Sequence, residues 1–280
     1  AEIMPGLMTL DIDRITEIVE DTAATEVRPR FRALAEGEIR EKAGGDLVTV
    51  ADEAAEAVLA RRLAESLPGS VVLGEEAAAL DPAVLARLAD PAPVWVIDPV
   101  DGTGNFARGK EDFAVMVALV EAGETRAAWI HEPMRARTGW AVAGAGAYLD
   151  GTRLRVAAPP ADPARLEGTL HAGQHGARAL RQRLERRRAR VTVTRSLRCA
   201  GAEYLRMAEG RQHFSLFTKL APWDHAPGTL ILREAGGVAR LIDGRPYTPA
   251  VTDGEALLLA PDPESWAVLY ERLLADDAAP

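Results

Sequence analysis

The chain has few of the residues from which disulfides, zinc sites and membrane spans are built. Cys199 is the only cysteine, so no disulfide can form within the chain and no thiolate metal cluster is available. The longest apolar runs, such as residues 113–120, are far shorter than the ~20 residues that a transmembrane helix needs. No secretory signal is visible. We therefore expect a cytoplasmic protein that does not enter a membrane.

Positive charge is also scarce. The 280 residues include 33 Lys and Arg against 42 Asp and Glu, which gives a net charge of -9. Binding to a nucleic-acid backbone depends on clustered positive charge, so nucleic acid is not an expected partner. Lysine occurs only at Lys42, Lys110 and Lys219, which indicates a base-composition bias towards arginine. An acidic protein that handles phosphate usually needs metal cations to reverse the local charge.

Hydrophobic periodicity predicts a mixed α/β chain. We expect helices over residues 12–34, 52–67, 82–88, 176–190, 200–209, 223–235 and 264–275. Strands are expected over residues 71–73, 94–97, 113–120, 125–130, 138–142, 168–171, 191–194, 213–217, 238–242 and 256–259. The segment Ala157-Ala158-Pro159-Pro160 is the best boundary between two halves, residues 1–155 and 156–280.

Acidic residues follow two of these strands and open one of these helices. Asp98 and Asp101 come after the strand 94–97, and Glu75 follows the strand 71–73. Asp-Pro and Asp-Gly pairs are ordinary turn formers, so either pair alone would indicate a turn. If the two strands are neighbours, however, the three carboxylates meet at one edge of a sheet. Asp224, at the start of a helix in the second half, can reach them there.

Carboxylates packed together raise one another's pKa and need compensating positive charge. Ligand sets made only of oxygen suit Mg²⁺, Ca²⁺ or Mn²⁺ and not zinc. The five histidines show no zinc-like spacing, so they are structural or lie near the substrate. The sequence therefore predicts a site for hard divalent cations.

Small residues follow the acids at Gly102-Thr103-Gly104, where a helix can begin. Free backbone N–H groups at such a helix start bind phosphate, although a simple turn is the alternative. Asp52, ahead of the second helix, is either an N-cap or the acceptor of a hydrogen bond from a catalytic hydroxyl, with Thr103 as its natural partner.

Arginines are dense between Arg178 and Arg190, in the only strongly basic run. A solvated helix face or a dimer-facing surface is the first interpretation of such a run. Contact with RNA is the alternative, but the run lacks interleaved aromatic residues.

Five segments keep an order and spacing that a known family also has. They are Asp46-Leu47-Val48-Thr49, Gly74-Glu75-Glu76, Asp98-Pro99-Val100-Asp101-Gly102-Thr103, Trp223-Asp224 and Glu234-Ala235-Gly236-Gly237. With them the chain resembles the inositol monophosphatase family of metal-dependent phosphomonoesterases. The resemblance implies a five-layered αβαβα sandwich of the inositol monophosphatase and fructose-1,6-bisphosphatase type. It also implies a homodimer, two or three Mg²⁺ ions per active site and sensitivity to lithium.

The resemblance further implies roles for individual residues. The metal ligands would be Glu75, Asp98, Asp101, Asp224 and the main-chain oxygen of Val100. Thr103, paired with Asp52, would help to orient the attacking water, and Glu75 would join them as a catalytic residue. Asp101 and the backbone of Gly102 and Thr103 would contact the substrate phosphate. The first half would then carry the metal and phosphate motifs, and the second half Asp224 and the substrate contacts.

One departure from the family bears on the substrate. Residues 214–222 lack the acid that inositol-phosphate enzymes of the family place shortly before Trp-Asp to bind sugar hydroxyls, which weakens the case for inositol monophosphate. Glu203 occupies a position that is usually small or neutral, and is expected to supply the missing polar contact.

We expect hydrolysis of a small phosphate monoester, a sugar or polyol phosphate, by metal-activated water. A 3′-phosphoadenosine 5′-phosphate phosphatase is the alternative if the arginine-rich helix faces the site, and a histidinol-phosphate phosphatase is another. A regulatory member of the family that binds RNA or a protein partner is the alternative from a different class.

Overall fold

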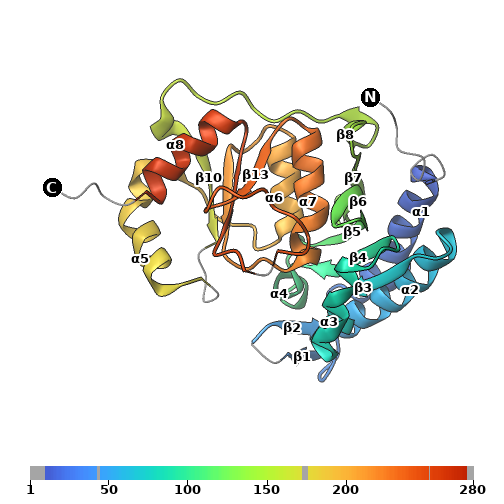
Figure 1. The fold of residues 1–280 in the computed structure, drawn as a ribbon. Coiled ribbons are helices and arrows are strands. Elements are labelled where there is room, and N and C mark those ends of the chain that lie inside the picture. Colours follow the sequence, from blue (N-terminus) through green and yellow to red (C-terminus); the bar gives the residue numbers. More distant parts are fainter. Residues whose placement is uncertain (1–9, 43–44, 172–175, 252, 276–280) are drawn as a thin grey trace.

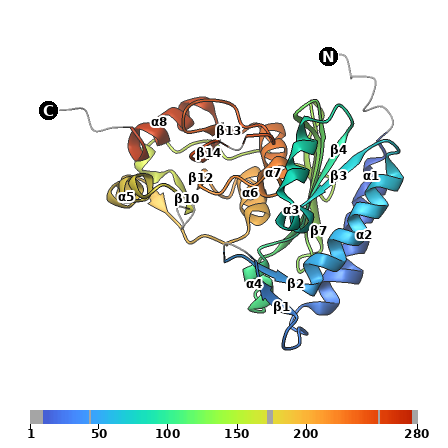
Figure 2. The same cartoon turned by 60° about the horizontal axis from the view of Figure 1, so that its bottom comes forward.

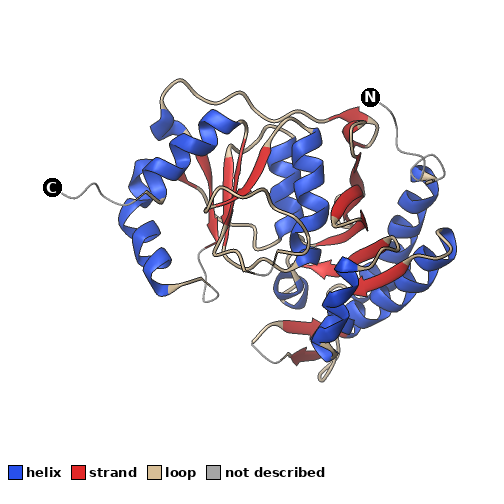
Figure 3. Cartoon of the chain, in the orientation of Figure 1, coloured by secondary structure: helices blue, strands red, loops and turns tan. Residues whose placement is uncertain are grey.

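The computed structural model describes residues 10–42, 45–171, 176–251 and 253–275, in which helices and strands alternate (Figure 3). The helices are α1 (Ile12–Thr22), α2 (Val50–Ser66), α3 (Glu75–Leu80), α4 (Thr103–Ala107), α5 (Arg178–Arg187), α6 (Ala200–Ala208), α7 (Pro222–Glu234) and α8 (Pro263–Leu273). The strands are β1 (Ile39–Glu41), β2 (Leu47–Thr49), β3 (Val71–Gly74), β4 (Val94–Asp101), β5 (Ala114–Glu121), β6 (Glu124–Glu132), β7 (Arg137–Val142), β8 (Gly146–Leu149), β9 (Thr152–Arg153), β10 (Glu167–His171), β11 (Thr192–Val193), β12 (Phe214–Phe217), β13 (Val238–Leu241) and β14 (Leu257–Ala260).

Two sheets alternate with three layers of helices (Figures 1 and 2). The larger sheet has the order β3-β4-β5-β6-β7-β8-β9, and the smaller has the order β11-β10-β12-β14-β13. Helices α1 and α2 pack on the outer face of the larger sheet, while α6 and α7 lie between the two sheets. Helices α5 and α8 cover the outer face of the smaller sheet. This order confirms the predicted αβαβα sandwich.

Strand β5 shows why the larger sheet must be covered on both faces. Successive side chains of a strand point to opposite faces. Val115 and Val117 face α1 and α2, whereas Ala114 and Met116 face α6 and α7. All four are fully buried, so the continuous apolar run reflects burial on both sides of the sheet.

Each helix and strand expected from periodicity is present, with shifted ends. The opening helix is shorter than expected, because α1 ends at Thr22 and continues as a π-helix (Ala23–Val27) and a 3₁₀ turn (Arg28–Arg30) around Pro29. The connection expected over residues 82–88 is a 3₁₀ helix (Pro82–Ala89). Periodicity did not predict β1, β2, β8, β9, α3 and α4, which are too short to show a repeat.

Residues 71–153 supply the larger sheet and residues 167–260 the smaller one. The division at 155/156 remains a prediction, because α6 and α7 pack against both sheets in one core. Among the helices of the described ranges, none is long and apolar enough to cross a membrane.

Candidate metal and phosphate site

The pairing of β3 with β4 brings the first acids together. The two strands are parallel, with Gly74 opposite Ile97, so Glu75 and Asp98 follow at the same level of the sheet. Strand β4 does not end at Ile97 as expected, because its pairing with β5 extends to Asp101 with an irregularity after Asp98. Pro99 lies in this irregular stretch, where its missing N–H breaks no ladder hydrogen bond.

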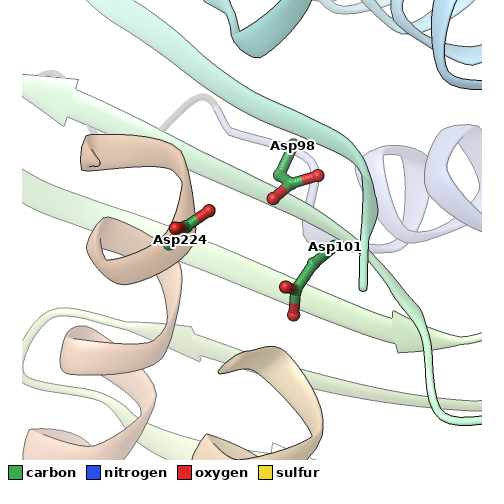
Figure 4. Close-up of side chains that lie close together, drawn as sticks. All are labelled: Asp98, Asp101 and Asp224. Carbon is green, nitrogen blue, oxygen red and sulfur yellow. The ribbon is translucent and has the colours of Figure 1, made fainter. Parts of the chain in front are cut away.

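Three carboxylates converge at this edge, as Figure 4 shows. Asp98 and Asp101 come from β4, and Asp224 comes from the first turn of α7 in the second half of the chain. One carboxylate oxygen of each lies within 4.8 Å of the others, which is close enough to share a metal ion. Asp98 and Asp101 are almost completely buried, with 1% and 8% of their surface exposed.

Glu75 belongs to the same group of charges but is held by a lysine. Its Oε1 accepts a hydrogen bond of 2.8 Å from Nζ of Lys42, which also donates one of 2.7 Å to Glu76. Burial, and then the charge of Asp224, raises the pKa of Glu75. Glu75 therefore lies beside the three aspartates without being part of the group within 4.8 Å.

A second lysine approaches from the other side. Nζ of Lys219 lies 2.8 Å from Oδ2 of Asp46. Burial alone would lower the pKa of Lys219, but the charge of Asp224 and the hydrogen bond to Asp46 outweigh it and raise that pKa. Two of the three lysines of the chain thus lie at the acidic cluster. From the sequence, the scarcity of lysine indicated only a base-composition bias, and neither lysine was assigned a role at the site.

The carboxylates are unfavourably placed without further positive charge. The pKa of Asp98 is raised well above its ordinary value by burial and then by Glu75 and Asp101. Burial and Asp224 raise the pKa of Asp101 to about 6, although its Oδ2 accepts a 2.6 Å hydrogen bond from the Gly201 N–H. Buried, like-charged, all-oxygen donors are the environment that Mg²⁺ fits. The donor set therefore fits the predicted cation.

Thr103 lies beside the carboxylates and is linked to Asp52. Its hydroxyl is 3.0 Å from Oδ1 of Asp52 and 2.9 Å from the carbonyl oxygen of Val100. A hydroxyl has only one proton, so it donates to one of these acceptors at a time. Burial is the main cause that raises the pKa of Asp52 to about 6.

Asp52 is not the N-cap of α2, because the helix begins three positions earlier than expected from Asp52 as its cap. Thr49 is the N-cap of α2, and Asp52 is the third helical residue of a capping box with it. Oδ2 of Asp52 accepts from the backbone N–H of Thr49 at 2.8 Å and from its hydroxyl at 2.6 Å. Asp52 therefore caps the helix with one oxygen and holds Thr103 with the other.

The turn after the acids needs glycine at its first position. Gly102 has φ +87°, a left-handed conformation that residues with a Cβ rarely adopt. A Cβ there would lie 3.0 Å from the carbonyl oxygen of Asp112 and 3.3 Å from Cβ of Cys199. Gly102 is the N-cap of the short helix α4, which begins at Thr103. Both residues line a pocket of about 200 Å³ together with Glu75, Asp98, Val100, Asp101 and Asp224.

Glu203 is fully buried and does not line this pocket. Its Oε2 lies 2.7 Å from Nε2 of His171, and its Oε1 accepts a 2.9 Å hydrogen bond from the Leu197 N–H. Burial would raise the pKa of Glu203, but the hydrogen bond and charge of His171 lower it overall. His171, which periodicity did not single out, lines a neighbouring cavity. Glu203 therefore contacts His171, and His171 in turn lines the larger cavity. A direct contact between Glu203 and the substrate stays a prediction.

The comparisons with known proteins agree with this geometry. The model of the inositol monophosphatase family matches residues 11–276. The chain belongs to this family. It is similar to the inositol-1-monophosphatase of Bacillus subtilis, with 33% identity over 207 residues that cover 72% of this chain and 75% of that one. It is also similar to the Nus factor SuhB of Escherichia coli, with 35% identity over 212 residues and coverage of 72% and 74%.

Solved structures show the same fold. The extragenic suppressor protein suhB from Bartonella henselae superposes with a TM-score of 0.79 at 24% identity, covering 95% of this chain and 99% of that one. As a member of the inositol monophosphatase family, the chain is a phosphatase.

Proposed function

We propose that the protein hydrolyses a small phosphate monoester, a sugar or polyol phosphate, in a reaction that requires Mg²⁺. The observation that carries this proposal is the convergence of Asp98, Asp101 and Asp224 from two halves of the chain within 4.8 Å. Folding alone gives no reason to bury three like charges together, because burial and repulsion both raise their pKa.

Asp98, Asp101, Asp224, Glu75 and the carbonyl oxygen of Val100 would hold two or three Mg²⁺ ions. When bound, Mg²⁺ supplies positive charge for the phosphate oxygens and lowers the pKa of water. The Gly102 and Thr103 N–H groups, with Asp101, would bind and orient the phosphoryl group. The Thr103 hydroxyl, held by Asp52, would orient the attacking water. Glu75 would join them in orienting this water.

The other properties proposed rest on family membership. We propose a cytoplasmic homodimer that is inhibited by lithium. Histidinol phosphate and 3′-phosphoadenosine 5′-phosphate are the alternative substrates, and the arginine-rich helix α5 favours the second because it lines the cavity next to the carboxylates. A regulatory role that involves RNA or a protein partner is the alternative that the name of the Escherichia coli relative supports.

Phosphate release by the purified protein tests the proposal. We expect release from at least one of a panel of sugar, polyol, histidinol and nucleotide phosphates with Mg²⁺, and none after removal of Mg²⁺ with EDTA. Equal rates with and without EDTA would contradict the metal requirement. Negligible release from the whole panel, with tight and salt-sensitive RNA binding in a gel shift, would favour the regulatory role.

A further inference from the structure

A larger cavity, of about 1120 Å³, opens beside the carboxylate pocket. The two spaces share four lining residues, which are Asp101, Arg198, Lys219 and Asp224. The two spaces therefore adjoin at these residues. A ligand with its phosphoryl group at the carboxylates would extend past Arg198 and Lys219 into the larger cavity.

The larger cavity is lined by positive charge. Besides the two shared aspartates, the described lining holds five cationic residues and one acid, which are Arg178, Arg181, Arg188, Arg198, Lys219 and Glu185. Glu185 offsets one of these cations, because its Oε2 lies 3.2 Å from Nη1 of Arg188. With the two aspartates counted, five cationic residues of the described lining still face three acids. An excess of positive charge in a cavity of a protein with net charge -9 indicates an anionic ligand.

The arginines of α5 face the cavity because of their spacing. Positions 178, 181, 185 and 188 follow one another at intervals of three or four residues, so they lie on one side of the helix and the turn that continues it. Leu180 and Leu184 are buried in the core with α8 and the smaller sheet. The packing of this apolar side holds the arginine side at the cavity.

Arg198, at the junction of the two spaces, has a strained backbone. Its φ of +56° lies in the left-handed region, which is uncommon for residues other than glycine. The Arg198 N–H donates to Oγ of Ser196 at 2.9 Å, and Nδ2 of Asn105 donates to the Leu197 carbonyl oxygen at 2.8 Å. Strain of this kind concentrates at ligand-binding sites and is maintained by the surrounding structure.

One wall of the larger cavity is aromatic and cationic. In place of an acid before Trp223-Asp224, the chain presents Phe217 and Lys219 to the cavity. The ring of His171 stacks on Phe217 at a centroid distance of 4.5 Å. An aromatic wall beside cations suits a ligand that combines a flat or apolar body with an anionic group.

We propose that Arg178, Arg181 and Arg188, with Arg198 at the entrance, form a second anion-binding subsite for a second phosphate or carboxylate of the substrate. The proposal rests on the proposed function, which places the scissile phosphoryl group at the carboxylates. The substrate class is then a doubly anionic phosphate ester, such as a sugar bisphosphate or a nucleoside bisphosphate. The concave shape of the cavity and the lack of aromatic residues along α5 favour a small molecule over RNA.

The test compares substrates that differ by one phosphate. The pairs are fructose 1,6-bisphosphate with fructose 1-phosphate, and 3′-phosphoadenosine 5′-phosphate with 3′-adenosine monophosphate. We expect the doubly charged member of at least one pair to have a kcat/KM at least about tenfold higher, as charge-assisted hydrogen bonds would give. Equal kcat/KM values within both pairs would overturn the proposal while leaving the phosphatase assignment intact.

Charge-removing variants locate the subsite. The triple variant Arg178→Gln, Arg181→Gln, Arg188→Gln should lose the preference and retain wild-type kcat/KM for p-nitrophenyl phosphate, which has no second anion. Arg186→Gln is the matched control, because Arg186 is exposed on the same helix and does not line the cavity. Loss of the preference in the control, or its retention in the triple variant, would contradict the proposal.

A binding measurement separates the subsite from catalysis. Calorimetry in the presence of Mg²⁺ should show that fructose 6-phosphate or 5′-adenosine monophosphate binds at least about tenfold more tightly than fructose or adenosine, and that the triple variant removes this difference. That result would support the subsite even if no ester were hydrolysed. Failure of both phosphates to bind, with salt-sensitive retention of single-stranded RNA that the triple variant abolishes, would overturn it and assign the helix to RNA.

Discussion

Thr103 and Asp52 are 51 residues apart in the sequence, yet the Thr103 hydroxyl lies 3.0 Å from Oδ1 of Asp52. The contact joins the turn after β4 to the first turn of α2. Thr103 also lines the carboxylate pocket. The proposed function assigns the orientation of the attacking water to this pair.

Replacing Thr103 with Val, which keeps the shape and removes the hydroxyl, should lower kcat by about 10²–10⁴-fold, the range typical of a positioned proton-transfer group. Because the threonine is half-buried, unfolding in urea should change by only about 1 kcal/mol. Thr25→Val is the control, since that exposed hydroxyl bonds only to the carbonyl oxygen of Asp21 among its described contacts. A wild-type kcat for the Thr103 variant would contradict the role assigned to the pair.

Replacing Gly102 with Ala should destabilise the protein and reduce activity for two reasons. The backbone at this position is left-handed, and the added Cβ would have close neighbours. Gly123→Ala separates these causes, since Gly123 has φ +77° in a hairpin turn with nothing within 4 Å of its Cβ position. Urea unfolding should show a loss of about 1–2 kcal/mol for the control and more for the Gly102 variant. Equal losses would show that crowding around Gly102 is relieved at no energetic cost.

Stabilisation by Mg²⁺ should depend on pH. Without metal, the raised pKa values of Asp52 and Asp101, both about 6, mean that the folded protein binds more protons than the unfolded chain between about pH 4 and 6. The stability that these groups contribute is present below their unfolded pKa and is lost as the pH rises through about 6. Mg²⁺ favours the ionised carboxylates, so it should restore more stability at pH 8 than at pH 5.

Thermal unfolding measures this effect as the difference in Tm with and without Mg²⁺ at each pH. Burial lowers the pKa of His131 and of His225, which gives the opposite pH dependence, so the comparison with and without Mg²⁺ is made at each pH separately. Removal of a pKa shift of one unit changes the free energy of unfolding by about 1.4 kcal/mol, which corresponds to a few degrees in Tm. A Tm increment that is the same at pH 5 and pH 8 would exclude Asp101 as a Mg²⁺ ligand.

The layers could be predicted from the sequence because each strand or helix has its own hydrophobic pattern and the motifs together indicate the family. The apolar run of β5 fixed a strand that is buried on both faces, and the order of the motifs matched a family with a known sandwich. The meeting of Glu75 with Asp98 followed from a single assumption, that β3 and β4 are neighbours, which their parallel pairing confirms.

The sequence could not show which charges meet once the chain has folded. Lys42 pairs with Glu75 across 33 residues, and Lys219 pairs with Asp46 from the other half of the chain. Nothing in the local pattern separates the arginines of α5 that line the cavity from those that do not until the packing of Leu180 and Leu184 is known. The sequence also could not show that Glu203 is buried and contacts His171, whereas its contact with the substrate stays a prediction.

Calorimetric titration of Mg²⁺ into the wild-type protein and the Asp224→Asn variant, with phosphate release measured on the same samples, tests the central claim most directly. Asparagine preserves the shape and removes one of the three converging charges. We predict saturable Mg²⁺ binding and Mg²⁺-dependent phosphate release for the wild type, and the loss of nearly all of both in the variant. Wild-type binding and turnover by the purified Asp224→Asn protein would contradict the account.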